Sequence, residues 1–496
     1  MPSPPSSAWR PPEPPAATAR RSSRAVVLTV AGAFFLLLLD SSILNTSLPR
    51  VAQSMGVQPL ALSPTITGYL LASVAAMPLS NWLCGKFGIR RVYLLSIAVF
   101  TLASAACGGS ASLWQLVAAR VVQGAAAGMM LTVGRTLAVQ DADKSELLSI
   151  TSLLVWPALM APVLGPPLGG WITTYFSWRW NFFLNVPMGL MAMLLILRFV
   201  PRDTARDELP MDWLGAFYTV GGLATFFGGL ELMAQATEGG GHWGLALSFF
   251  ALGAVLLALA WRHLVRSPHP LIGLAPLKVK TFAISTFSGG IFSSLCLHAT
   301  PYLLPLMFQL AFGATAAAAG AMLIPYFLGN LTMKTVTTPL LRRFGFKRVL
   351  LVDGVFCMLP VAVCGFLGAQ TPWLLMSALL FFAGATRSLL FTALNTLCYA
   401  DVEPRERGTA ATLSSVSMLL AQSLGIVVST LMLAAAKASD GRATLELGDF
   451  RLAFFGVAAI GLLSVTQYAR LSRHAGEEVS GSRRPERTTA KAEATR

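Results

Sequence analysis

The chain has 496 residues, of which 55% are hydrophobic and only 12% are charged. Soluble domains carry about 25% charged residues, so this chain cannot cover a water-facing surface, and we expect an all-α polytopic membrane protein surrounded by the lipid bilayer. The net charge of +15 does not indicate nucleic-acid binding, because the basic residues lie in short loops rather than along one helix face. The six cysteines form no Cys-x-x-Cys pair, so we predict no disulfide framework, no metal site and no cofactor.

Apolar segments long enough to cross a bilayer, which takes about 20 residues, follow one another along the chain. We predict fourteen, at residues 25–46, 63–84, 92–110, 113–138, 147–174, 180–199, 212–236, 243–261, 281–309, 316–340, 348–368, 372–397, 408–436 and 450–469. Residues 1–24, rich in Pro, Ser and Ala, are expected to be a disordered tail. No small-residue cleavage site follows the first apolar run, so we interpret it as a retained helix.

Lysine and arginine in the loops predict the orientation of a membrane protein, because they favour the cytoplasmic side. With both termini in the cytoplasm, 28 of the 37 basic residues lie on that side and five lie outside. The remaining four lie within helices: Arg120, Arg135, Lys334 and Arg387. We therefore expect a multi-pass protein with both termini cytoplasmic, including the basic tail at 470–496.

A ten-residue phrase occurs twice. Leu83-Cys-Gly-Lys-Phe-Gly-Ile-Arg-Arg-Val92 returns as Leu340-Leu-Arg-Arg-Phe-Gly-Phe-Lys-Arg-Val349. The first copy joins the second and third apolar segments, and the second copy joins the tenth and eleventh. This spacing predicts two parallel six-helix repeats, at 25–199 and 281–469, with two helices inserted between them in residues 200–280.

Four further phrases carry a resemblance to a known family. They are Leu39-Asp-Ser-Ser-Ile-Leu-Asn-Thr-Ser-Leu-Pro49, Ala119-Arg-Val-Val-Gln-Gly124, Gly165-Pro-Pro-Leu-Gly-Gly170 and Ser177-Trp-Arg-Trp-Asn-Phe-Phe-Leu-Asn-Val-Pro-Met-Gly189. In this order they resemble signatures of the major facilitator superfamily (MFS fold). Within it they are similar to the fourteen-helix drug:proton antiporter family of the EmrB/QacA type, in its MdtD-like branch.

The resemblance implies a proton-coupled secondary transporter in a bacterial plasma (inner) membrane. It would export small amphipathic or cationic compounds by alternating access, and it would not be an enzyme; the sequence holds no P-loop, His-Glu-x-x-His or nucleophile-elbow motif. Two alternatives stay open: export of a narrow endogenous metabolite, and a membrane sensor that does not transport. A periplasmic adaptor protein is a candidate partner, and a monomer suffices because one chain holds both halves.

Asp40 is the main candidate for proton coupling. It lies about two-thirds of the way along the first helix, where a carboxylate costs roughly 2.5–3.5 kcal/mol unless it is paired, hydrated or protonated. Arg120 of the fourth helix cannot lose its charge and is the natural partner, and Gln123 lies one turn further along. The alternatives are a permanent structural ion pair, or a carboxylate that caps Asn45 and Ser41.

Other candidates fall into three groups. In the antiporter motif, Gly165, Gly169 and Gly170 allow a close helix approach and Pro166 bends the helix, which by resemblance seals the path against proton leak. The substrate or gating candidates are Asn45, Gln123, Trp156, His298, Lys334 and Arg387. The cytoplasmic gating loop comprises Lys86, Gly88, Arg90 and Arg91 with Arg343, Gly345 and Arg348, although Asn81 and Gly85 replace a Gly and an Asp of the family pattern.

Two acidic residues and a set of aromatic residues complete the predictions. Glu231, near the outer end of the seventh helix, is expected either to reach water or to take part in coupling. Asp353 is expected to pair with Lys347 or Arg348. An adaptable pocket is predicted from Trp156, Phe183, Tyr302, Phe308 and Phe327.

Overall fold

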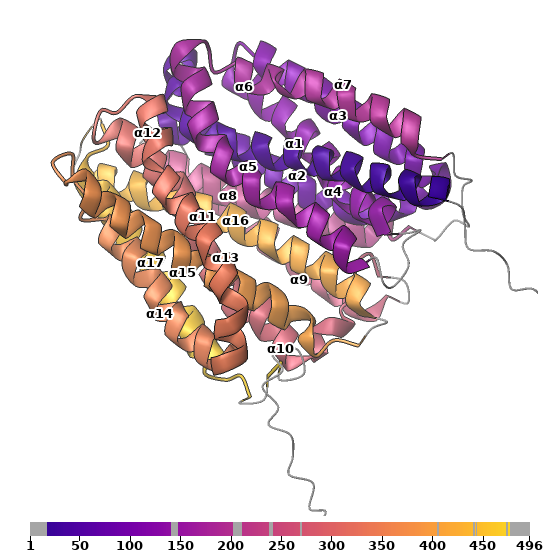
Figure 1. Ribbon diagram of the computed structural model, residues 1–496. Helices are drawn as coiled ribbons and strands as arrows, with labels where there is room; N and C mark the ends of the chain where they lie inside the picture. Colours follow the sequence, from indigo (N-terminus) through magenta and orange to yellow (C-terminus); the bar gives the residue numbers. More distant parts are fainter. Residues whose placement is uncertain are drawn as a thin grey trace, which may run out of the picture.

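The computed structural model describes residues 17–139, 147–201, 211–237, 242–267, 270–403, 406–439, 442, 444–472 and 475–476. Within these ranges the regular structure is helical, and twelve helical stretches are long and apolar enough to cross a membrane (Figure 1). An all-α membrane fold, as predicted, is therefore confirmed. Helices α5 and α14 coincide with the other two predicted segments but are not among those twelve.

The helices of the first part of the chain are α1 (Ala17–Met55), α2 (Ser63–Phe87), α3 (Ile89–Gly109), α4 (Leu113–Val139), α5 (Leu147–Tyr175), α6 (Trp180–Phe183) and α7 (Asn185–Phe199). Two helices follow, α8 (Trp213–Thr237) and α9 (Trp243–Arg266). The last part contains α10 (Lys280–Ala283), α11 (Gly289–Leu310), α12 (Ala316–Met322), α13 (Ile324–Phe344), α14 (Phe346–Cys364), α15 (Trp373–Ala400), α16 (Arg407–Ser439) and α17 (Leu447–Tyr468).

Some predicted boundaries were wrong. Helix α1 begins at Ala17, so the prediction of a disordered tail fails for residues 17–24, where Ala and Arg are good helix formers. Residues 1–16 and 477–496 lie outside the described part, so the rest of both predicted tails is untested.

Three predicted helices are interrupted. Residues 180–199 form α6 and α7, and residues 316–340 form α12 and α13. In both cases a proline, Pro187 or Pro325, lies in the first turn of the second helix, where its missing N–H leaves no hydrogen bond unmade. The segment 281–309 contains a π-helical turn at Ile284–Ser288.

The repeated phrase adopts the same backbone twice. Gly88 has φ 85° and ψ 148°, and Gly345 has φ 75° and ψ 159°. In each copy the glycine N–H donates to the carbonyl four residues earlier, at 3.0 Å, and the valine four residues later donates back to the glycine carbonyl at 3.2 Å. We call the end of the bundle that holds Gly88 and Gly345 the repeat end, and the opposite end the far end.

The helices before residue 200 pack mostly against one another, as do those after residue 280, and Figure 1 shows them as an indigo-to-magenta and an orange-to-yellow group. The two groups meet where α5 packs against α12 and where α2 packs against α16. Helix α9 packs chiefly against α8, and α8 also contacts α2 and α16. The α8–α9 pair therefore lies beside the junction of the two groups.

Candidate functional site

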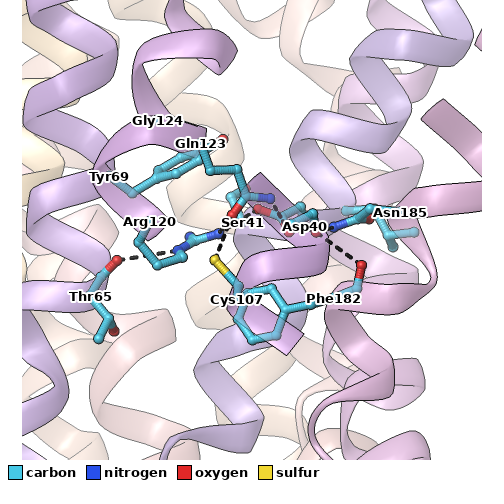
Figure 2. Close-up of polar contacts among 12 residues, drawn as sticks. Asp40, Ser41, Thr65, Tyr69, Cys107, Arg120, Gln123, Gly124, Phe182 and Asn185 are labelled. Carbon is cyan, nitrogen blue, oxygen red and sulfur yellow. Dashed lines mark hydrogen bonds and ion pairs between the residues drawn. The ribbon is translucent and has the colours of Figure 1, made fainter. Parts of the chain in front are cut away.

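Asp40 and Arg120 form an ion pair inside the first group of helices (Figure 2). Arg120 Nη1 lies 2.7 Å from Asp40 Oδ2, and both side chains are only 1% exposed. An acid on α1 and a base on α4, distant in sequence, are thus brought into direct contact. Asp40 does not cap Ser41, whose hydroxyl donates to the Leu38 carbonyl.

The second oxygen of Asp40 accepts two amide donors. Gln123 Nε2 donates to Oδ1 at 3.2 Å, and Asn185 Nδ2 donates to the same oxygen at 2.6 Å. Asn185 also donates to Ser104 Oγ at 2.9 Å, which ties α7 and α3 to the pair. Sequence reasoning missed Asn185, although this polar residue lies in the phrase Ser177–Gly189 that carried the family resemblance.

The guanidinium of Arg120 is held on several sides. Its Nε donates to the Thr65 carbonyl at 3.3 Å, and its Nη1 donates to Gln123 Oε1 at 2.9 Å. Its Cζ lies 4.1 Å from the centre of the Tyr69 ring, a cation–π contact. Four helices, α1, α2, α4 and α7, therefore fix one buried ion pair whose charges cancel, and protonation of Asp40 would remove its ionic component.

The glycines of the antiporter motif lie at helix–helix contacts near the far end. A Cβ on Gly165 or Gly169 would collide with Ser42 or Ile43 of α1. A Cβ on Gly170 would collide with the Ala316 carbonyl of α12, and a Cβ on Gly320 of α12 would collide with the Pro166 carbonyl. The motif thus packs α5 against α1 on one side and against the second group of helices on the other.

Two hydrogen bonds cross the same junction. The Ala317 N–H donates to Thr174 Oγ1 at 2.9 Å, and Gln309 Nε2 donates to the Thr46 carbonyl at 2.9 Å. Nearer the repeat end, Arg135 Nη1 of α4 donates to Ser415 Oγ of α16 at 3.3 Å.

The remaining predicted substrate residues do not join the Asp40 pair, apart from Gln123. Asn45 is half-buried and its Oδ1 has no partner among the described residues, while the side chain of Trp156 lies outside them. His298 Nδ1 donates to the Ser294 carbonyl at 2.7 Å. Lys334 lies on α13 and Arg387 on α15, two helices that pack against each other in the second group.

Basic residues of the loop repeat contact rings and carbonyls. Lys86 Nζ lies 5.2 Å from the Trp82 ring centre, and Arg343 Cζ lies 5.5 Å from that of Phe344. Arg90 Nη2 donates to the Leu197 carbonyl at 2.9 Å, and Lys347 Nζ donates to the Leu471 carbonyl at 2.6 Å. Leu197 lies in the last turn of α7, and Leu471 lies three residues after the end of α17. The two copies therefore make similar contacts beside the last helix of their own group.

Expectations about other side chains had different outcomes. Of the two alternatives for Glu231, contact with water is wrong, because it is 8% exposed and accepts hydrogen bonds from Ser63 and Thr67 of α2; a part in coupling stays a prediction. Asp353 is buried and forms no ion pair with Lys347, whose ammonium is satisfied elsewhere, or with Arg348. Tyr302, Phe308 and Phe327 belong to the packed core rather than to an open pocket.

Comparison with known proteins identifies a family and several relatives that share this architecture. The family model of the Major Facilitator Superfamily matches residues 30–298 and 282–494. MdtD of Pectobacterium carotovorum, a protein named for multidrug resistance, is 31% identical over 80% of this chain and 84% of its own length. MdtD of Escherichia coli O6:H1 is 30% identical over 90% of this chain and 94% of its own.

Among solved structures, an auto-inhibited peptide transporter of the POT family superposes with a TM-score of 0.64. It is 16% identical and covers 91% of this chain and 97% of its own, a likeness of fold. A helical membrane bundle with this family match defines a transport protein rather than an enzyme. The chain belongs to the Major Facilitator Superfamily, and its resemblance to the MdtD-like branch is confirmed.

Proposed function

We propose that the protein is a proton-coupled secondary transporter that exports small amphipathic compounds across a bacterial inner membrane. The observation that carries the proposal is the buried Asp40–Arg120 pair. Asp40 can gain and lose a proton, whereas Arg120 stays charged. Two relatives named for multidrug resistance support export as the direction of transport.

The proposed cycle rocks residues 25–199 against residues 281–469. The contacts of α5 with α12 support closure at the far end in the present state. A proton that neutralises Asp40 weakens its attraction to Arg120, and this shifts the balance between the two openings. A membrane potential supplies about 2.3 kcal/mol per charge per 100 mV, enough to bias such an equilibrium.

The same proposal includes the topology. We propose fourteen crossings, with α5 and α14 added to the twelve apolar stretches, the α8–α9 pair as an insertion in residues 200–280, and both termini in the cytoplasm. The repeat end then faces the cytoplasm and the far end faces outward. The proposal also includes a monomer as the transporting unit, with a periplasmic adaptor protein as a candidate partner.

The test is dye efflux from cells that lack their own pumps. Wild type and Asp40→Asn are compared at equal membrane expression, with and without a protonophore, using ethidium as a cationic dye and carboxyfluorescein as an anionic dye. We expect efflux of at least one dye that needs both Asp40 and the proton gradient. Efflux that persists in Asp40→Asn, or that ignores the protonophore, contradicts proton coupling through Asp40. Absence of efflux from well-expressed wild type contradicts broad drug export and favours a narrow endogenous cargo.

A further inference from the structure

Two cations in the second half lie near the middle of their helices without an acidic partner. Lys334 lies in the middle of α13 and Arg387 in the middle of α15. The ion pairs found in the described part of the chain include neither. A charge at the bilayer centre costs about 2.5–3.5 kcal/mol on insertion scales, so water or a ligand must compensate these two.

Each cation is held by one neutral oxygen. Lys334 Nζ donates to Thr392 Oγ1 at 2.7 Å, and Arg387 Nε donates to the Leu297 carbonyl at 3.3 Å. Pro301, four residues after Leu297 in α11, has no N–H to donate to that carbonyl, so the guanidinium takes its place. A guanidinium has five N–H donors, and the others of Arg387 have no acceptor among the described residues.

The two cations lie on α13 and α15, which pack against each other. Phe391 follows Arg387 by one helical turn on α15, and its ring centre lies 6.0 Å from Lys334 Nζ. The Cζ of Arg387 lies 5.9 Å from the ring centre of Tyr326, about two turns before Lys334 on α13. An anionic group between these two helices would form charge-assisted hydrogen bonds of about 2.7–2.9 Å with either cation. The positive charge of Arg387 also acts on Lys334 and on His298 of α11.

None of the acids on the described membrane helices forms an ion pair with Lys334 or Arg387. Asp40 is paired with Arg120 in the first half, and Glu231 is hydrogen-bonded to α2. Asp353 lies on α14, which packs against α15, and is buried there without an ion pair to Arg387. Both Lys334 and Arg387 are half-buried, unlike the fully buried Arg120.

We propose that Lys334 and Arg387 form an anion-binding site, and that the transported compound carries a carboxylate, phosphate or sulfonate group next to an apolar body. This inference rests on the transport function proposed above and specifies its substrate class. A purely cationic cargo, one of the two classes that the family resemblance implies, would meet two uncompensated positive charges between α13 and α15.

The test measures the binding of small probes to the purified full chain by titration calorimetry. The probes are 2-naphthoate, its neutral amide 2-naphthamide, and the cationic 2-naphthyltrimethylammonium, which share one apolar body. We expect naphthoate to bind at least about tenfold more tightly than the amide, and the cation to bind weakest. Lys334→Gln and Arg387→Gln each reduce that ratio toward one, and Arg387→Lys retains part of it. Arg262→Gln, which changes an exposed basic residue of α9, is the control and leaves the ratio unchanged.

Equal binding of naphthoate and naphthamide by wild type overturns the anion site. A preference for naphthoate that survives in both glutamine variants also overturns it. Absence of naphthoate binding at millimolar concentration is the third outcome that overturns it. Displacement of naphthoate by stoichiometric phosphatidylglycerol would instead assign the site to a lipid headgroup and overturn its role in cargo recognition. Anion preference without any efflux contradicts the proposed transport function alone. Proton-driven efflux without anion preference contradicts this inference alone.

Discussion

At the scale of single residues, Arg120 does more than neutralise Asp40. It also donates to Thr65 of α2 and to Gln123 of its own helix, and it lies over the Tyr69 ring. A lysine has a single point charge and no planar group to stack or to divide among these partners. The geometry of the pair therefore depends on an arginine at this position.

We expect Arg120→Gln to destabilise the protein by about 3–5 kcal/mol, because it leaves Asp40 charged and buried without a counter-ion. Adding Asp40→Asn should recover most of that loss without restoring transport. Thermal unfolding of the two single variants and the double variant in detergent measures the coupling. Additive losses in the double variant would show that the two residues are not energetically linked. Arg120→Lys should keep the fold and still lose transport.

Asn185 offers a second residue-scale prediction. Its amide donates to the charged Asp40, whereas that of Asn181, one turn earlier, donates to the neutral hydroxyls of Ser47 and Thr173. Hydrogen bonds to charged groups contribute about 1.5–3 kcal/mol and neutral ones about 1 kcal/mol. Asn185→Ala should therefore cost more stability than Asn181→Ala in unfolding experiments. The difference should vanish in an Asp40→Asn background, and its persistence there would contradict the role assigned to the charge.

At the scale of elements, the turn at Gly88 recurs at Gly345 with a similar positive φ, a backbone conformation that favours glycine. A Cβ on Gly345 would meet nothing within 4 Å, so any cost of a substitution there comes from its positive φ. We expect Gly345→Ala to destabilise by about 1–3 kcal/mol. Gly32→Ala in α1, which also meets nothing within 4 Å, should be neutral or stabilise by about 0.5–1 kcal/mol. Equal unfolding temperatures of these two variants would contradict the argument.

Asp212 stabilises the N-terminus of α8 by accepting a hydrogen bond from the Gly215 N–H. Burial opposes its charge, but hydrogen bonds from the Gly215 N–H, from His263 and from the Leu271 N–H outweigh burial and hold the pKa of Asp212 below its usual value. Because the folded-state pKa is depressed, this stabilisation is complete above the unfolded value of about 3.9 and is lost only as the pH falls through the folded one.

We therefore expect Asp212→Asn to cost about 0.5–2 kcal/mol, with no change between about pH 5 and pH 8. The measurement is thermal unfolding across that range in a His263→Gln background, which removes the imidazole titration. If the destabilisation caused by Asp212→Asn falls steadily as the pH drops from 8 to 5, the Asp212 carboxylate is not ionised over that whole range.

At the scale of the whole molecule, the junction between α5 and α12 can be tested by cross-linking. Thr174 and Ala317 face each other across the two halves, whereas Ser47 and Thr173 lie within one half, with their hydroxyl oxygens 2.7 Å apart. Oxidation of a Thr174→Cys, Ala317→Cys variant should abolish transport, and reduction should restore it. The Ser47→Cys, Thr173→Cys variant should transport in both states. Full activity of the oxidised inter-half variant would contradict rocking at this junction.

The helical fold and much of the site could be predicted because membrane helices carry strong local signals. Long apolar runs predicted the helices, and an ionisable residue in such a run singled out Asp40 and Arg120. Asn185 and the bonding of Glu231 to α2 depend on helix rotation and on contacts between distant segments, which periodicity alone does not specify. The breaks at α6–α7 and α12–α13 lie inside continuous apolar runs, so a hydropathy pattern could not reveal them.

The glycine contacts between α5 and α12 have a consequence for the energy of opening. Gly170 lies against the Ala316 backbone, and Gly320 lies reciprocally against the Pro166 backbone, so at these two points the main chains lie directly against each other. Such a seam can part without leaving a buried ion unpaired and without reordering long side chains. In the proposed cycle, the seam itself then favours neither the closed nor the open form strongly, and the occupancy of other sites by proton and cargo decides between them.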